Sequence, residues 1–341
     1  MDMHEILEAL HLQDESQCVL ATILCVEGHS YRKAGASMLF KPNGKQIGAV
    51  SPGCLEHDLQ EIADVVRTSG QFSLISYNMN ADEDAIWGDA IGCGGEIRLL
   101  LEPVHGQLLK LLLVAREKLE AGITVRLMRS WDDAGIDYVL HDLANVETDA
   151  VYWEEVDERY HLFVDITPRQ RLVIFGVGKD AEAIYALVKQ IGFQVIVVDW
   201  RPALCTQERF PEAAIITGSP EAIAEQLQFR SSDYLIVCSH HLQRDREMIR
   251  VALPLQLVYI GILGSKKRIR MLFETFLIPS NVRAPIGLAI GADGPYEIAV
   301  SVAAELIAIR AGRKERLRKE RRQDEYYSPL FGSRTEQANG H

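Results

Sequence analysis

The chain has 341 residues, of which 48% are hydrophobic, and a formal net charge of −12 at pH 7 with histidine counted as neutral. This length predicts two or three domains with sizeable cores, and the negative charge argues against broad binding to nucleic acid or to anionic membranes. Six cysteines without regular spacing, and without a Cys-x-x-Cys pair, predict reduced thiols rather than a disulfide framework or a structural zinc site.

The N-terminus lacks a basic segment followed by an apolar stretch, which argues against a signal peptide. No apolar run approaches the roughly 20 residues that span a bilayer. We therefore expect a cytoplasmic protein, with neither nucleic acid nor membrane among its partners.

The first half of the chain has the mixed periodicity of an α+β domain. Helical spacing of apolar residues alternates with short β-rich runs, and an Asn-Gly turn at 43–44 joins two of the strands. The pattern predicts helices over residues 4–12, 55–68 and 108–120 and strands over residues 18–26, 37–41, 46–50, 72–77, 97–101, 124–129, 138–140, 150–154 and 160–164.

Three glycine-rich loops in this half, residues 28–36, 51–56 and 88–96, are the candidates for binding. Cys54 stands where a strand gives way to a helix, whose free N–H groups favour a thiolate ligand or nucleophile. Cys93 lies among glycines, so we expect its thiol to lie beside exposed backbone N–H groups, which suits an anion or a thiolate directed at a cofactor. For either cysteine the alternative is a small buried apolar side chain.

Two adjacent cations, Arg32 and Lys33, lie in the first of these loops. They are suited to clamp a phosphate. A solvated pair of side chains is the equally open alternative.

Residues 171–199 carry the pattern of a dinucleotide-binding βαβ unit. A buried strand runs into Gly176 and Gly178, Ala181 takes the third small position, and a second strand ends on Asp199. The first glycine allows a tight turn, the second lets the backbone approach a phosphate, and the acid suits a ribose hydroxyl. The same turn also occurs as plain architecture, so a bound dinucleotide is a separate expectation.

The strand–loop–helix pattern then repeats, which predicts a doubly wound parallel sheet. Glycine, serine and histidine residues follow the strands at 234–237 and 258–263, among them His240, His241, Gly264 and Ser265. Because the carboxyl ends of parallel strands meet at one edge, this edge is the expected ligand crevice. The imidazoles can hold a ligand or transfer a proton, or they can be exposed side chains at a helix start.

We expect three segments: an α+β domain over residues 1–168, a Rossmann-like domain over 169–312, and a charged, partly disordered tail over 313–341. A closing helix is predicted over residues 295–309, followed by a helical stretch over 310–322 rich in both charges.

Motifs from both halves, in this order, resemble the XdhC/CoxI family, the accessory proteins of xanthine dehydrogenase and related molybdenum hydroxylases. The resemblance rests on GAVSPGCLE at 48–56, GCGGEI at 92–97, YIGILGSKKR at 259–268, and the segments 28–38, 173–181, 197–202, 284–288 and 297–301.

The resemblance implies a role in binding molybdenum cofactor, supporting its sulfuration and inserting it into an apo-xanthine dehydrogenase or a related hydroxylase. It also implies a homodimer and makes a cysteine desulfurase a candidate partner. Cys54 and Cys93 would contact the molybdenum, which soft thiolates suit. The expected cofactor-binding residues are Arg32, Ser51, Gly53, Cys54, Glu56, Gly92, Cys93, Gly94, Gly95, Gly176, Gly178, Asp199, His240, Gly264 and Ser265.

The chain departs from the family pattern mostly in its second half. Lys179 and Asp180 replace the usual inner pair of the glycine turn, and Trp200 stands where a second acid is usual. NAD(P) or FAD in the Rossmann crevice therefore stays an open expectation. Two other functions stay open as well: an NAD(P)-dependent oxidoreductase with His240 as acid/base, and a dinucleotide-sensing interaction module without chemistry.

Overall fold

The computed structural model describes residues 2–11, 18–78, 95–143, 151–275 and 277–327. The chain divides into two compact units, Met1–Pro168 and Arg169–His341. Within the described residues, no helix combines the length and the hydrophobicity needed to cross a bilayer.

The first unit is built on two antiparallel sheets. The five-stranded sheet contains β1 (Cys18–Gly28), β2 (Ser37–Phe40), β3 (Gln46–Gly48), β4 (Ser73–Asn78) and β5 (Gly95–Val104), in the order β3-β2-β1-β5-β4. The four-stranded sheet contains β6 (Thr124–Asp132), β7 (Gly135–Leu143), β8 (Val151–Val156) and β9 (Arg159–Ile166), in the order β7-β6-β9-β8.

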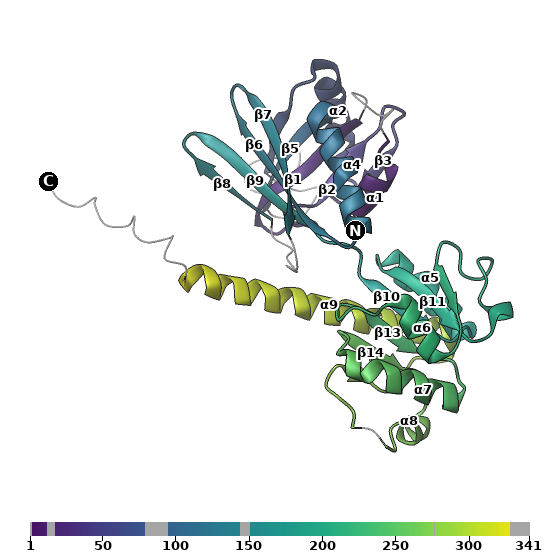
Figure 1. Ribbon diagram of the computed structural model, residues 1–341. Helices are drawn as coiled ribbons and strands as arrows, with labels where there is room; N and C mark the ends of the chain where they lie inside the picture. Colours follow the sequence, from purple (N-terminus) through teal and green to yellow (C-terminus); the bar gives the residue numbers. More distant parts are fainter. Residues whose placement is uncertain (1, 12–17, 79–94, 144–150, 276, 328–341) are drawn as a thin grey trace. The chain divides into compact units, whose positions relative to one another are not determined.

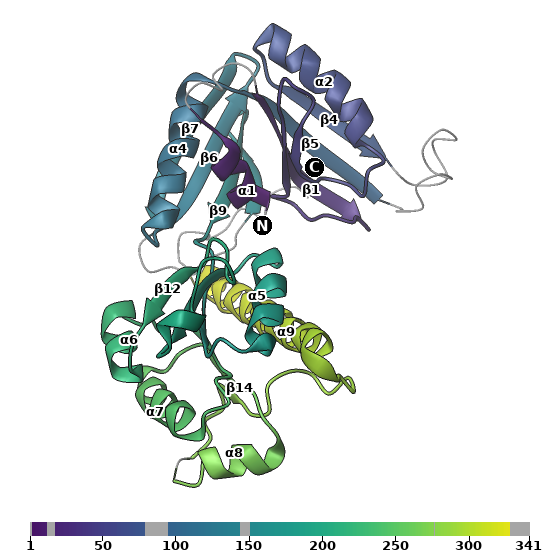
Figure 2. The ribbon, with the colours of Figure 1, turned by 90° about the vertical axis from the view of Figure 1, so that its right-hand side faces the viewer.

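Among the described residues of this unit, the helices α1 (Asp2–Ala9), α2 (Glu56–Ser69) and α4 (Gly106–Glu120) cover these sheets. Figure 2 shows α2 lying on the five-stranded sheet, where Leu59, Ala63 and Val66 are buried at helical spacing. A second cluster joins α1 and α4 to both sheets, with β1, β5, β6 and β9 contributing side chains. The sheet of β1 is therefore buried on both faces, in keeping with its continuous apolar sequence.

The second unit is a doubly wound parallel sheet, as the sequence predicts. It contains β10 (Arg171–Phe175), β11 (Gln194–Asp199), β12 (Ala214–Thr217), β13 (Tyr234–Val237), β14 (Tyr259–Ile262) and β15 (Val282–Arg283). The order β12-β11-β10-β13-β14-β15 reverses direction between β10 and β13, which is the ligand-binding switch point of such sheets.

Helices cover both faces of this sheet (Figure 1). One face packs α5 (Lys179–Gln190) and α9 (Gly294–Tyr327), and the other packs α6 (Pro220–Leu227), α7 (Leu242–Ala252) and α8 (Lys266–Leu272). The predicted helices 295–309 and 310–322 form the single helix α9. The expected tail thus begins inside α9, because Gly312 alone weakens the helix there and no proline interrupts it.

Candidate functional site

The pairing of the strands brings the described parts of the three glycine-rich loops to one end of the five-stranded sheet. Gly28, which opens the first loop, pairs with Gly95, which closes the third. Met38 pairs with Gly48, so the first loop ends where the second begins. Loops far apart in the sequence are therefore neighbours at the sheet end, which is the arrangement that a shared binding site requires.

Hydrogen bonds within the second loop, between its own residues, hold it in shape. Glu56 accepts hydrogen bonds from the backbone N–H groups of Ser51 at 3.0 Å and Leu55 at 3.1 Å, and from the Ser51 hydroxyl. The Ser51 oxygen in turn accepts from Gly53 N at 3.1 Å and Leu55 N at 3.2 Å. Ser51 and Glu56 thus fix the loop that carries Cys54.

Pro52 and Gly53 are the exposed residues of this loop, and Cys54 follows them. Gly53 has a φ of +120°, and an added Cβ would meet no atom within 4 Å, so the glycine is required by backbone conformation and the space above it is open. Cys54 is half-buried and packs against the same apolar cluster as Ala36 of the first loop. Its thiol is free of any disulfide.

The third loop lies mostly outside the described residues, and Gly92, Cys93 and Gly94 lie there. Gly95 is described and packs closely: an added Cβ would stand 2.4 Å from the carbonyl oxygen of His29 and 2.6 Å from that of Glu27. Gly95 therefore serves the contact between the first and third loops. This contact leaves no room for a side chain.

Arg32 of the first loop forms an ion pair with Asp2 at the start of α1. Burial lowers the pKa of the Arg32 guanidinium. About a third of the side chain stays exposed, at 31%. The neighbouring Lys33 is exposed.

The two glycines of the Rossmann turn have different roles. Gly176 has a φ of +108°, and an added Cβ would lie 2.3 Å from Ser239 Cα, so the loop after β13 requires this glycine. At Gly178 the nearest atom to an added Cβ is His240 Cδ2 at 3.8 Å, an ordinary contact. The missing side chain of Gly178, at the N-cap of α5, leaves room that the protein itself does not fill.

Asp199, the expected ribose acid, is fully buried and its carboxylate is saturated. Oδ2 accepts from Val177 N at 3.0 Å and Arg201 Nη2 at 2.9 Å, and Oδ1 accepts from Arg201 N at 2.8 Å and Nε at 2.9 Å. Arg201 also lies over the Trp200 ring, 4.3 Å from its centroid. In this conformation Asp199 ties the glycine turn to β11.

His240 pairs with Asp180, at 2.9 Å between Nε2 and Oδ2, across the switch point. Its φ of +60° is unusual for a residue other than glycine. His241 instead caps α7, because its Nδ1 accepts from Arg244 N at 3.3 Å. Of the two imidazoles, His240 is the one directed at the glycine turn.

The loop after β14 is used by the helix that follows it. Ser265 caps α8 and accepts from Arg268 N at 3.3 Å, and an added Cβ on Gly264 would lie 2.8 Å from Arg268 Cδ. Arg268 reaches back to the buried Asp245 at 2.6 Å. These residues join two helices at the crevice edge.

Cys238 is buried just past β13, and the carboxylates of Asp245, Asp180 and Asp199 act on its thiol electrostatically. Burial first, and then these carboxylates, raise the pKa of the Cys238 thiol well above its usual range. That thiol is therefore held neutral, and it donates a hydrogen bond to the Gly176 carbonyl oxygen at 3.6 Å. Within the described residues, no group of three or more histidine, cysteine, aspartate or glutamate side chains could hold a metal ion.

Sequence patterns did not identify the roles of Asp180 and Arg201. Each is bound to a residue that was a candidate: Asp180 to His240, and Arg201 to Asp199. The only signal for Asp180 was its departure from the family motif.

The fold and the loop arrangement agree with two family models. One, described as the XdhC Rossmann domain, matches residues 172–306, and the other, described as the XdhC and CoxI family, matches residues 11–78. The chain belongs to the XdhC and CoxI family.

Its relatives support the same assignment. The chain is 37% identical over 328 residues to a probable xanthine dehydrogenase subunit of Bacillus subtilis, covering 91% of this chain and 98% of the relative. It is 26% identical over 305 residues to the molybdenum cofactor insertion chaperone PaoD of Escherichia coli, covering 87% and 85%. A crystal structure described as a xanthine dehydrogenase of Bacillus halodurans superposes with a TM-score of 0.81 at 35% identity, covering 92% and 97%.

Proposed function

We propose that this protein is a xanthine dehydrogenase accessory protein that binds molybdenum cofactor and inserts it into an apo-hydroxylase. The observation that carries the proposal is the meeting of the glycine-rich loops at one sheet end, with the half-buried thiol of Cys54 on a loop that Ser51 and Glu56 fix. The relative named as a cofactor insertion chaperone supports the same role.

The residues at this sheet end fit such a cofactor. Molybdenum cofactor supplies an anionic phosphate, a flat pterin and a metal that soft thiolates suit. The open space above Gly53 admits a ligand next to Cys54, and Arg32, Lys33 and the backbone N–H groups of the loops suit its phosphate. Cys93, Gly92 and Gly94, which lie outside the described residues, are proposed to belong to the same site.

The Rossmann crevice is proposed to hold the nucleotide part of a cofactor or a separate NAD(P) or FAD. The space at Gly178 supports this proposal, since a phosphate can approach the backbone at the N-terminus of α5. A ribose hydroxyl reaches Asp199 only when Arg201 leaves it. His240, Gly264 and Ser265 would border the ligand.

The experiment is anaerobic mixing with molybdenum cofactor, followed by desalting and assay of the protein fraction for molybdenum and pterin. Retention near one per chain supports the proposal. C54S and C93S are expected to retain less. C25S is the matched control, because Cys25 is also half-buried and lies on β1 of the same sheet. If C54S, C93S and C25S retain equal amounts of molybdenum cofactor, Cys54 and Cys93 do not bind it as thiolates.

Insertion is a second, separate measurement. Loaded protein is mixed with an apo-hydroxylase, and the activity of the hydroxylase is followed with and without a cysteine desulfurase. If hydroxylase activity rises only when the desulfurase is present, sulfuration is assigned to this protein acting together with the desulfurase. No gain in either case contradicts the chaperone proposal. Sedimentation of the free protein tests the proposed homodimer.

The oxidoreductase alternative predicts oxidation of NAD(P)H with small carbonyl substrates, with His240 as the acid. The paired Asp180 orients that imidazole, which is the observation in its favour. NAD(P)H binding without turnover and without retention of molybdenum cofactor would instead favour a dinucleotide-sensing module.

A further inference from the structure

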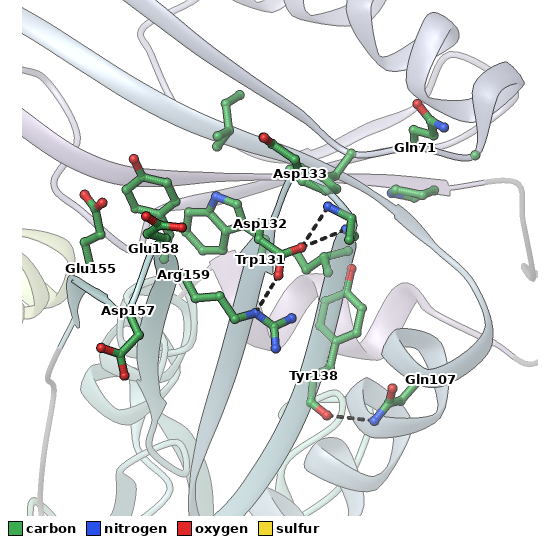
Figure 3. Close-up of a pocket in the computed structure, with 18 of the residues that line it drawn as sticks. Gln71, Gln107, Trp131, Asp132, Asp133, Tyr138, Glu155, Asp157, Glu158 and Arg159 are labelled. Carbon is green, nitrogen blue, oxygen red and sulfur yellow. Dashed lines mark hydrogen bonds and ion pairs between the residues drawn. The ribbon is translucent and has the colours of Figure 1, made fainter.

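Figure 3 shows a pocket of about 1040 Å³ in the first unit, between the tips of the β6–β7 and β8–β9 hairpins. Asp132 there accepts from Ala134 N at 2.8 Å and pairs with Arg159 at 3.0 Å, and the Trp131 side chain is only 2% exposed. These groups serve the hairpins themselves. The crevice of the second unit differs, because it contains a cation that the protein uses only in part.

The acid at the ribose position of this crevice has no capacity left. In a dinucleotide-binding βαβ unit, the acid that ends the second strand accepts a hydrogen bond from the 2′-hydroxyl of the adenine ribose. Here that acid is Asp199, which is fully buried and accepts from Val177 N and from three nitrogen atoms of Arg201. Four donors fill the lone pairs of a carboxylate. A 2′-hydroxyl therefore finds no free acceptor there.

Arg201 offers a donor at the same position. Its guanidinium bonds to Asp199 through Nε and Nη2, each at 2.9 Å, and lies 4.3 Å from the centroid of the Trp200 ring. These contacts fix the plane of the group. Nη1 makes no hydrogen bond within the part of the chain that the structure describes, and 38% of the side chain is exposed. One edge of a fixed guanidinium is thus open to a ligand.

The other arginine at the glycine turn has no such edge. Arg209 donates from Nε to Glu182 at 2.6 Å, from Nη1 to the Leu204 carbonyl oxygen at 2.6 Å and from Nη2 to the Val177 carbonyl oxygen at 2.7 Å. All three of its side-chain nitrogen atoms are therefore used to hold the turn. Of these two arginines, Arg201 is the one that can bind a ligand without giving up a bond.

This arrangement favours a phosphate over a hydroxyl on the ribose. Hydrogen bonds between a guanidinium and a phosphate are about twice as strong as those between neutral groups, and a planar guanidinium that is already fixed loses little freedom when it binds. A second guanidinium, that of Arg244 in α7, lies 5.9 Å from the centroid of the Trp200 ring and is 36% exposed. Its charge adds to the attraction for an anion.

We propose that the Rossmann crevice selects NADP(H) over NAD(H), with Arg201 binding the 2′-phosphate of the adenine ribose. This proposal rests on the proposed binding of a dinucleotide in the crevice, and it names the group that discriminates between the two dinucleotides. Asp199 is a positioning residue, because it holds the guanidinium and does not touch the ribose. The pyrophosphate of the same ligand approaches the backbone at Gly178.

The test is a fluorescence titration of the full-length protein with NADPH and with NADH, at low and at physiological salt. Competition by 2′,5′-ADP and by 5′-ADP shows whether the 2′-phosphate itself carries the difference. Arg201→Gln can still donate to Asp199 but has no charge, and Arg201→Lys keeps the charge but loses the planar fork. The matched control is Arg250→Gln, which removes the charge of an exposed arginine on α7. Circular dichroism checks that each variant is folded.

We expect NADPH to bind about tenfold more tightly than NADH, or better, with a larger ratio at low salt. R201Q should lose most of this ratio by binding NADPH more weakly, R201K should keep part of it, and R250Q should match the native protein. Equal affinity for NADPH and NADH, a ratio that survives in R201Q, or an equal loss in R250Q overturns the selection by Arg201 but leaves a dinucleotide in the crevice. If neither dinucleotide nor 2′,5′-ADP binds, the proposed nucleotide site fails as well.

Discussion

Glu56 closes the loop of Cys54 by accepting a hydrogen bond from Ser51 N at 3.0 Å, and the Ser51 hydroxyl bonds to the same carboxylate. Ser51 and Glu56, which the sequence predicts to contact a cofactor, therefore bond to each other and hold the loop of Cys54 in position. The carboxylate lies at the N-terminus of α2, where a negative charge is stabilised by the helix dipole. Cys54 is held in place by this arrangement.

Replacing Glu56 by alanine is expected to lower the free energy of unfolding by about 1–3 kcal/mol, because Ser51 and Leu55 lose a charged acceptor. Retention of molybdenum cofactor should fall with it, since Cys54 is no longer positioned. Urea unfolding measures the change in stability, and the desalting assay measures the retention of molybdenum cofactor. Glu61→Gln, an exposed change on the same helix, is the control and should alter neither. Full retention by E56A would show that the loop needs no such support.

The two glycines of the Rossmann turn should respond in opposite ways to alanine. Gly176→Ala places a methyl group on the backbone of Ser239 at a positive φ, so we expect a loss of stability of about 3 kcal/mol or more. Gly178→Ala should change stability by no more than about 1 kcal/mol but obstruct a nucleotide phosphate. Thermal unfolding and fluorescence titration with NADH separate the effects. Unimpaired NADH binding by G178A would contradict a phosphate at this turn.

Stability should fall at alkaline pH because of Cys205. Burial first, and then the nearby Asp199, raise the pKa of its thiol from 9.0 to about 11. Between these values the unfolded chain has lost the proton that the folded chain keeps, so stability decreases as pH rises. The loss is about 1 kcal/mol per pH unit at most.

The measurement is urea unfolding under reducing conditions at pH 8.5 and 10.5 for the native protein and for C205A. Other titrating groups are common to both proteins, so the difference between the two pH dependences reports the thiol. A smaller decline for C205A agrees with the raised pKa. Parallel declines would show that Cys205 titrates normally in the folded protein.

The buried pair of Arg129 and Glu102 should be costly to break and tolerant of joint replacement. Both side chains are fully buried, with 2.7 Å between Nε and Oε1. Arg129→Met should lower stability by about 3–5 kcal/mol, because Glu102 is left as an unpaired buried charge. The double variant R129M/E102L should recover most of the stability that Arg129→Met loses. The exposed pair of Lys118 and Asp142 is the control, and K118M should cost less than about 1 kcal/mol.

The turn between β8 and β9 should become more stable when its acids are replaced. Asp157 and Glu158 have φ values of +51° and +64°, where asparagine and glycine are favoured in a two-residue hairpin. D157N/E158G is expected to raise stability by about 1 kcal/mol. Glu154→Gly, within β8, is the control and should be destabilising. A double variant less stable than the native protein would contradict the expectation.

The amino-acid sequence alone was sufficient to predict the class of fold in both halves. Helical and strand periodicities predicted the described elements of the first unit and most strands of the second, since apolar side chains at fixed spacing must share one buried face. Helices α6, α7 and α8 and the strand β15 were not predicted individually. The glycine turn ending at Ala181 and the strand ending at Asp199 predicted the parallel sheet, because these local patterns act within one βαβ unit. The continuity of α9 through Gly312 was not predicted, since a single glycine weakens a helix without ending it.

Which loops meet, and what each polar group binds, depended on the packing of the whole chain. Strand register places Gly28 against Gly95, a relationship between residues far apart in the chain. Tertiary packing also places Arg201 on Asp199 and Asp180 on His240, and it gathers Trp131 and Tyr160 under a rim of acids. Local sequence specifies the conformation of a segment, but a site depends on the packing of several segments, and that packing is set by the whole core.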